Sequence, residues 1–203
     1  MVKLKVDDLI EEACVRRPAS ADAAHPPWGR RRGVEEASPM SGPLTNVLAD
    51  DHTRLDGLLQ RAMAVGGAVN CAAYAESRAG LLRHISLEEK ILLPAAQRLQ
   101  GGDPLPMAAM LRLDHGALAA LLVPTPTPAI IAAIRTVLAA HNVLEEGPGG
   151  VYERCEQLAG AEADALLARL QAAPEVPVAP YSDGPQGFCR KFAFSSVLES
   201  ASH

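Results

Sequence analysis

The stretch His84-Ile85-Ser86-Leu87-Glu88-Glu89 recurs later in the chain as His141-Asn142-Val143-Leu144-Glu145-Glu146, so the pattern His-x-x-Leu-Glu-Glu is used twice. On an α-helix, residues four apart lie one turn above each other on the same face. Each copy therefore points one imidazole and one carboxylate to the same place. Two such helices that face each other inside a helical bundle would form a pocket for a metal cation.

A second repeat precedes each copy of the first. Leu48-x-x-Asp51-His52-x-x-Leu55 matches Leu111-x-x-Asp114-His115-x-x-Leu118 at every named position. A helical hairpin that is used twice predicts a four-helix bundle with a pseudo-twofold axis. Each half would contribute two histidines and at least one carboxylate to a shared centre.

Hydrophobic periodicity and terminal signals outline the helices. We expect helices over about 44–65, 71–100, 104–122, 128–146 and 151–171. Asn70, Asp103 and Thr127 are good N-caps, and a proline follows the last two of them. Pro94 should kink or end the second helix, although Gly101-Gly102 is the firmer stop.

The predicted fold is therefore all-α, an up-down four-helix bundle with an extra C-terminal helix and flexible tails. We assign residues 1–42 to a flexible N-terminal extension, 43–172 to the bundle, and 173–203 to a Pro/Gly-rich C-terminal tail. Met40 lies just before the bundle and is an alternative natural start of translation.

Composition and charge bear on partners and compartment. The formal net charge of −5 gives no electrostatic footprint for nucleic acid. The four cysteines are scattered without a Cys-x-x-Cys pair, which indicates free thiols in a reducing compartment. The most apolar run, 130–144, contains Arg135 and His141 and is too short to span a bilayer. Near the N-terminus, acidic residues stand where a signal peptide needs its apolar stretch. We expect a cytoplasmic protein that binds neither nucleic acid nor membrane.

The histidines give the sharpest indication of function. Of six, His25 and His203 lie in the predicted tails, and the other four lie on apolar helical faces. A single histidine on such a face is more often a hydrogen-bonded core residue than a ligand. Here four histidines are in register with a repeat, and two of them have a carboxylate one turn away. This pattern favours metal binding, because without a metal the dry core would have to pair or neutralise all of these polar groups. The candidate ligands are His52, His84, Glu88, His115, His141 and Glu145.

The donor set restricts the metal. Imidazole and carboxylate without thiolate suit iron or manganese, and zinc or copper less well. Six to eight donors are too many for one zinc ion and fit two metals bridged by carboxylates, for which Glu88 and Glu145 are the candidates. Glu89 and Glu146 lie about 100° round the helix from them, so each is a weaker candidate, either as a further ligand or as a hydrogen-bonding partner of one. Asp51 and Asp114 are expected to be partners or caps rather than ligands.

His52, His84-x-x-x-Glu88, His115 and His141-x-x-x-Glu145 together resemble a hemerythrin-like domain, also called the HHE cation-binding domain, over about residues 44–152. The resemblance implies an up-down bundle that holds a non-haem di-iron centre bridged by carboxylates and a solvent-derived oxygen. Oxygen-carrying members have a second histidine on the third helix, where this chain has Ala119, and end with an aspartate where it has Glu146. In this respect the chain is closer to the family's sensor and repair members.

Three functions remain open at this point. The first is a binding or sensing protein whose two irons respond to O2, nitric oxide or the iron and redox state, with a partner protein or a second copy engaged through the tails. The second is a di-iron enzyme, an oxidase, peroxidase or nitric-oxide and iron-centre repair protein, for which Tyr74 and Tyr152 are the available acid or base groups. The third is a helical scaffold that a metal such as zinc only stabilises.

Overall fold

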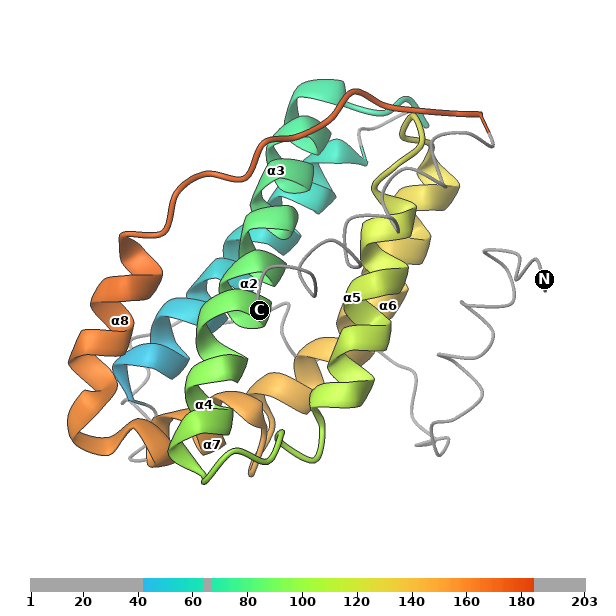
Figure 1. The fold of residues 1–203 in the computed structure, drawn as a ribbon. Coiled ribbons are helices and arrows are strands. Elements are labelled where there is room, and N and C mark those ends of the chain that lie inside the picture. Colours follow the sequence, from blue (N-terminus) through green and yellow to red (C-terminus); the bar gives the residue numbers. More distant parts are fainter. Residues whose placement is uncertain (1–41, 64–66, 185–203) are drawn as a thin grey trace, which may run out of the picture.

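The computed structural model describes residues 42–63 and 67–184, and every regular element within them is a helix (Figure 1). The prediction of an all-α fold is confirmed for these residues. None of their helices combines the length and apolar character that a membrane crossing requires. The elements are α2 (Pro43–Ala62), α3 (Cys71–Leu87), the π-helical η1 (Glu88–Leu92), α4 (Leu93–Leu99), α5 (Ala108–Leu121), α6 (Pro128–Glu146), α7 (Val151–Ala159), the 3-10 helix η2 (Gly160–Glu162) and α8 (Ala163–Gln171).

Several predictions fall outside the described residues. They concern residues 1–41 of the predicted N-terminal extension, which include His25 and Met40, and residues 185–203 of the predicted C-terminal tail, which include His203. Of the four cysteines, the structure describes two, Cys71 and Cys155, and both are free thiols.

Two of the three predicted N-caps are confirmed. The side chain of Asn70 accepts a hydrogen bond from the backbone N–H of Ala73 at 3.2 Å, and that of Thr127 accepts one from Ile130 at 3.2 Å. The predicted helix start at Asp103-Pro104 is wrong, because α5 begins only at Ala108. Leu105 precedes Pro106, and a residue before proline is kept out of the helical region of backbone space, so a helix cannot run on from Pro104 through Leu105.

Pro94 does not end the second helix. The chain instead passes from α3 through the wider turn of η1 into α4, and the N–H of Leu93 bonds to the carbonyl of Glu88, five residues back. Pro94 then stands in the first turn of α4, a position at which a helix tolerates proline. The helix ends before Gly101-Gly102, as predicted, and both glycines have positive φ.

The predicted fifth helix is two helices. A 3-10 turn that begins at Gly160, with φ of 46°, separates α7 from α8. α7 packs against α2, α4 and α6, and α8 packs against α2 and η1. The carboxylate of Glu156 on α7 accepts hydrogen bonds from the N–H groups of Leu44 at 2.9 Å and Thr45 at 3.0 Å, so it caps the start of α2.

The longer helices pack in neighbouring pairs, α2 with α3, α5 with α6, and α2 with α6 (Figure 1). Gly80 allows the close approach of α3 to α2, because a Cβ there would lie 2.5 Å from Leu55 Cδ2. The core consists of two apolar clusters. One includes Leu44, Leu48, Leu87, Leu92, Leu111, Val151 and Leu166, and the other includes Leu55, Leu59, Leu81, Leu118, Ile131 and Ile134.

Four histidines lie where the chain passes from one apolar cluster to the other. On α2, His52 stands between Leu48 of the first cluster and Leu55 of the second. On α5, His115 stands between Leu111 and Leu118 in the same way. The repeat in the sequence therefore places a polar layer between two apolar cores.

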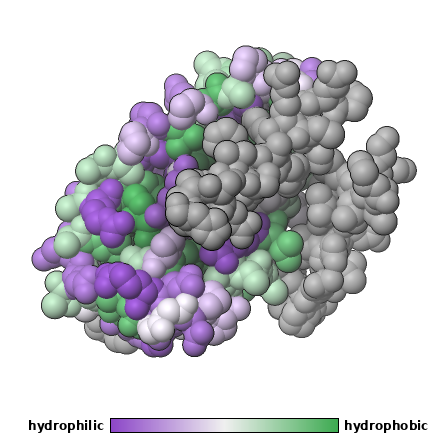
Figure 2. Space-filling view, viewed as in Figure 1, coloured by the Kyte–Doolittle hydropathy of each residue, from purple (hydrophilic) through white to green (hydrophobic). Residues whose placement is uncertain are grey.

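The first residues of the predicted C-terminal tail lie against the helices. After α8, residues 172–184 run without a helix along α3 (Figure 1). The buried Arg78 donates to the carbonyl of Ala179 at 2.8 Å, Ser182 N–H donates to that of Val123 at 3.0 Å, and Thr125 donates to the Asp183 carboxylate at 2.8 Å. On the face seen in Figure 2, hydrophilic residues are interspersed among hydrophobic ones over the described part of the molecule.

Candidate metal centre

The polar layer gathers the six side chains that the sequence singled out as ligands. Each of α2, α3, α5 and α6 contributes one histidine, η1 begins with Glu88, and Glu145 lies in the last turn of α6. All six side chains belong to residues that are at most 5 % exposed. The six are His52, His84, Glu88, His115, His141 and Glu145.

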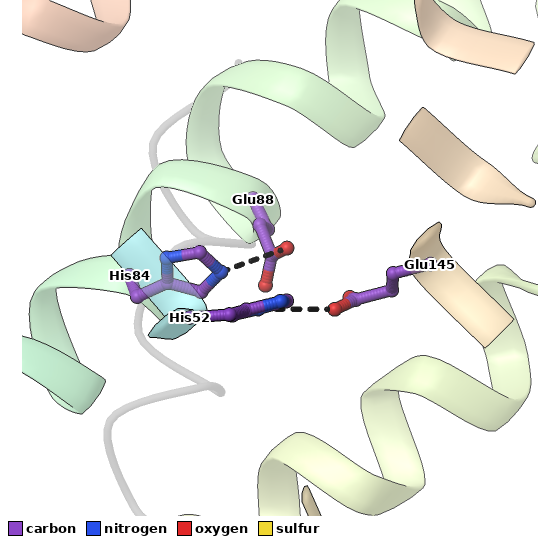
Figure 3. A group of neighbouring side chains, drawn as sticks. All are labelled: His52, His84, Glu88 and Glu145. Atoms are coloured by element: carbon purple, nitrogen blue, oxygen red, sulfur yellow. Dashed lines mark ion pairs between the residues drawn. The ribbon is translucent and has the colours of Figure 1, made fainter. Parts of the chain in front are cut away.

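A first group consists of His52, His84, Glu88 and Glu145, whose donor atoms all lie within 4.8 Å of one another. Figure 3 shows these side chains pointing toward a common point, His84 and Glu88 from the continuous stretch of α3 and η1, His52 from α2 and Glu145 from α6. His84 Nε2 lies 3.3 Å from Glu88 Oε1, and His52 Nε2 lies 3.4 Å from Glu145 Oε2. The two imidazole rings are 4.4 Å apart between centroids.

A second group consists of His115, His141 and the same two glutamates. His115 Nε2 lies 3.1 Å from Glu88 Oε2, and His141 Nε2 lies 3.1 Å from Glu145 Oε1. Both glutamates therefore belong to both groups, with one oxygen facing each. The two groups are related in the way that the repeat predicts, with one histidine pair from α2 and α3 and the other from α5 and α6.

The second group contains buried polar atoms whose close partners are the facing atoms of the same group. Glu88 Oε2, His115 Nε2 and Glu145 Oε1 are sealed from solvent; His115 Nε2 faces Glu88 Oε2 at 3.1 Å, and His141 Nε2 faces Glu145 Oε1 at 3.1 Å. Each of these contacts becomes a hydrogen bond only when the imidazole carries a proton on Nε2, and a buried polar atom is costly unless it is paired. A cation placed between the three converging atoms would satisfy all of them.

The outer nitrogen of each of the four histidines of the centre bonds to a carboxylate from another helical segment. The four Nδ1 contacts are His52–Glu146 at 2.6 Å, His84–Asp51 at 2.9 Å, His115–Glu89 at 2.8 Å and His141–Asp114 at 3.4 Å. An imidazole that donates from Nδ1 presents the lone pair of Nε2 to the centre, which is the form that binds a metal. The contacts join α2 to α6, α6 to α5, α5 to η1 and α3 to α2, a closed circuit.

These contacts bear on the weaker candidates. Asp51 and Asp114 are partners of histidines, as expected. Glu89 and Glu146 lie on the outer side of His115 and His52, beyond the two groups of converging donor atoms. Of the two roles that the sequence left open for these glutamates, the geometry favours that of hydrogen-bonding partner.

The charges of the metal-free centre balance through protons. Burial by itself lowers the pKa of His84, but the charge of Glu88 and the hydrogen bond to Asp51 outweigh it and raise this pKa to about 10. Burial is likewise outweighed at His141, where hydrogen bonds to Asp114 and Glu145 raise the pKa to about 10. Burial also disfavours the Glu88 carboxylate, yet the facing imidazoles hold its pKa well below its ordinary value. Imidazolium protons thus neutralise the buried glutamates, and a bound cation would replace them.

Tyr152 is the residue of the centre that the repeat could not reveal. It comes from α7, outside the two repeated hairpins, and its side chain is fully buried. Sequence reasoning had named it only as an available acid or base. Its hydroxyl lies within hydrogen-bond distance of all four members of the first group. Burial, with the charges of Glu88 and Glu145, raises its pKa well above the ordinary value, so the metal-free protein keeps a neutral phenol here.

The described residues thus form an all-helical structure with a buried histidine and glutamate cluster that could hold metal, which is compatible with a hemerythrin-like fold. Comparison of the chain with protein-family models, with curated proteins and with solved structures gave no match. The case for a function therefore depends on the residues and their geometry.

Proposed function

We propose that the chain is a hemerythrin-like protein, an up-down four-helix bundle that holds two non-haem iron ions and binds or senses O2, nitric oxide or the iron and redox state. One observation carries the proposal. Each of Glu88 and Glu145 directs one carboxylate oxygen to the first histidine pair and the other oxygen to the second.

This arrangement supports two ions rather than one. A carboxylate whose oxygens face different donor groups is suited to bridging, and each group then adds two imidazoles of its own. Imidazole with carboxylate favours iron, and manganese or zinc would accept the same donors. The partners on the outer nitrogens hold each ring in the orientation that ligation requires.

The surroundings of the centre support a small ligand. A cavity of about 10 Å³, lined by His52, Leu55, Asn142 and their neighbours, has room for about one water-sized molecule beside the first group. A larger groove of about 450 Å³ lies over α2, α3 and α8, outside Asp51. Asp51 separates that groove from His84, so a diatomic ligand fits the centre better than a bulky substrate does.

Metal ligation also supplies a signal. Because the ligands come from separate helices, loss of metal would loosen their packing and pass the state of the centre to the rest of the chain. The tails, or a second copy of the chain, are the places where a partner would receive it. A cytoplasmic location agrees with this role.

The test is metal content per chain by mass spectrometry, on protein made in iron-supplemented medium without a metal-affinity column. We expect about two irons per chain. Glu88→Ala and Glu145→Ala should lose both, since each glutamate serves both groups. His84→Ala or His141→Ala should lose metal at one group.

The matched controls are His25→Ala and His203→Ala, which remove a histidine from the predicted tails and should leave metal content unchanged. One zinc, or no metal, would contradict the iron-based functions and leave a helical scaffold. If iron is bound, a reversible change in the spectrum of the reduced protein with O2 or nitric oxide supports binding or sensing. Turnover of a defined substrate would favour the enzyme instead.

A further inference from the structure

We propose that Tyr152 is a fifth protein donor to the first metal position, through its phenolate oxygen, so that the two metal positions are chemically different. The inference rests on the proposed function, because it concerns how this chain holds the metal pair. It breaks the symmetry that the sequence repeat predicts.

The hydroxyl of Tyr152 stands at the point where the first group converges. It lies 3.1 Å from His52 Nε2, 3.1 Å from His84 Nε2, 2.6 Å from Glu88 Oε1 and 3.1 Å from Glu145 Oε2. One oxygen that faces all four donor atoms of a group is placed to share a cation with them. A tyrosine that only filled the core would need one polar partner.

The local backbone fixes this position. α7 follows α6 after a tight turn in which Gly150 N–H bonds to the carbonyl of Gly147 at 2.7 Å. A Cβ at Gly150 would lie 2.5 Å from the carbonyl oxygen of Glu145 and 2.7 Å from that of Gly147, so the turn needs glycine. Glu145 at the end of α6 and Tyr152 at the start of α7 are thereby held at one point.

Within the part of the chain that the structure describes, the second group has no such oxygen. The other two tyrosines of the chain, Tyr74 and Tyr181, lie near each other, with ring centroids 6.2 Å apart, and Tyr74 packs in the apolar cluster with Leu55. Glu88 Oε2, Glu145 Oε1 and His115 Nε2, which face the second group, have no hydroxyl within hydrogen-bond distance among the described residues. The first position therefore has five protein donors and the second has four.

Binding of the phenol oxygen to the metal requires only the loss of its proton. As the oxygen–metal bond forms, the phenol O–H bond breaks and its proton is released to water, as for any ligand that must be deprotonated. The hydrogen bond to Glu88 is lost in the same step. No electron transfer is involved.

The test uses the full chain loaded with ferrous iron under nitrogen and oxidised by ferricyanide, one electron per iron. Iron content, visible absorption and resonance Raman spectra are then compared for the unmodified chain, Tyr152→Phe and the control Tyr74→Phe. We expect about two irons and a phenolate-to-iron(III) charge-transfer band with phenolate ring modes. Tyr152→Phe should lose the band and the modes while still binding iron, and Tyr74→Phe should keep them.

Each other result is decisive. Two irons without the band would overturn the assignment of Tyr152 and leave the proposed function standing. One iron in the unmodified chain and two in Tyr152→Phe would show that the hydroxyl takes the place of an ion, which also overturns it. A chain that binds no iron would contradict the proposed function, and this assignment with it. Circular dichroism confirms that each variant is folded.

Discussion

Replacement of Glu88 by glutamine tests whether the centre is built around buried charge. Glu88 is 1 % exposed, and it faces His84 and His115 with its two oxygens. Glutamine keeps the size and one acceptor but removes the negative charge. In the metal-free protein, the imidazolium of His84 then loses the strongest of the contacts that raise its pKa.

The magnitude follows from the pKa. A rise from 6.5 to about 10 corresponds to about 4 kcal/mol of stabilisation at pH 7, from all neighbours of His84 together. Breaking a buried charge pair by removing one partner costs about 3–5 kcal/mol. We therefore expect Glu88→Gln to lower the free energy of unfolding by about 3 kcal/mol. At about 4 °C per kcal/mol for a domain of this size, the melting temperature should fall by about 12 °C.

The assay is urea denaturation and thermal melting of metal-stripped protein at pH 7, with the pKa of His84 followed by NMR. Glu145→Gln should cost a similar amount, because Glu145 is equally buried beside His141. The neighbouring change Glu89→Gln, at the half-buried outer side of His115, should cost about 1 kcal/mol or less. Equal costs for Glu88→Gln and Glu89→Gln, with an unchanged His84 pKa, would refute the reasoning.

Three other perturbations have defined outcomes. Folding raises the pKa values of His84 and His141, so the stabilisation that their protons give the metal-free protein is complete below pH about 6.5 and is lost as the pH rises through about 10. Across that window the melting temperature should fall, and the free energy of unfolding should decrease by at most about 1.4 kcal/mol per pH unit for each imidazole. Gly42→Ala places a Cβ 2.1 Å from Glu156 Cδ and so displaces the cap of α2, which should cost about 1 kcal/mol in urea denaturation and almost nothing when Glu156→Ala is already present. Asp51→Asn weakens the hold on His84 Nδ1 and should reduce metal affinity about 10–100-fold in competition with a chelator, and an unchanged affinity would contradict the role of the outer carboxylates.

The sequence predicted the helices and the six converging side chains because both depend on periodicity. A repeat that places His52 and His115 on apolar faces requires them to be buried, whatever the details of packing. The start of α5 was mistaken because the Asp103-Pro104 signal was judged without Pro106, two residues later. The single helix expected over 151–171 failed at Gly160, whose positive φ bends the chain.

The rest of the centre depends on distances between helices, which periodicity does not contain. The sequence left Glu89 and Glu146 open as further ligands or as hydrogen-bonding partners of ligands, and it did not indicate which histidines they would reach. They contact histidines of other helices, at 2.8 Å and 2.6 Å. Tyr152 lies outside the repeat, and only the turn around Gly150 brings its hydroxyl to the centre.

The closed circuit of carboxylate–imidazole contacts has a consequence for local opening. Each of α2, α5 and α6 takes part in two of the four contacts, and the continuous stretch of α3 and η1 also takes part in two, through His84 and Glu89. No long helix can therefore detach without breaking two of the contacts. Native-state hydrogen exchange should therefore find the amides of these helices around the polar layer opening as one cooperative unit. α8 makes none of the four contacts and should exchange through smaller, independent openings.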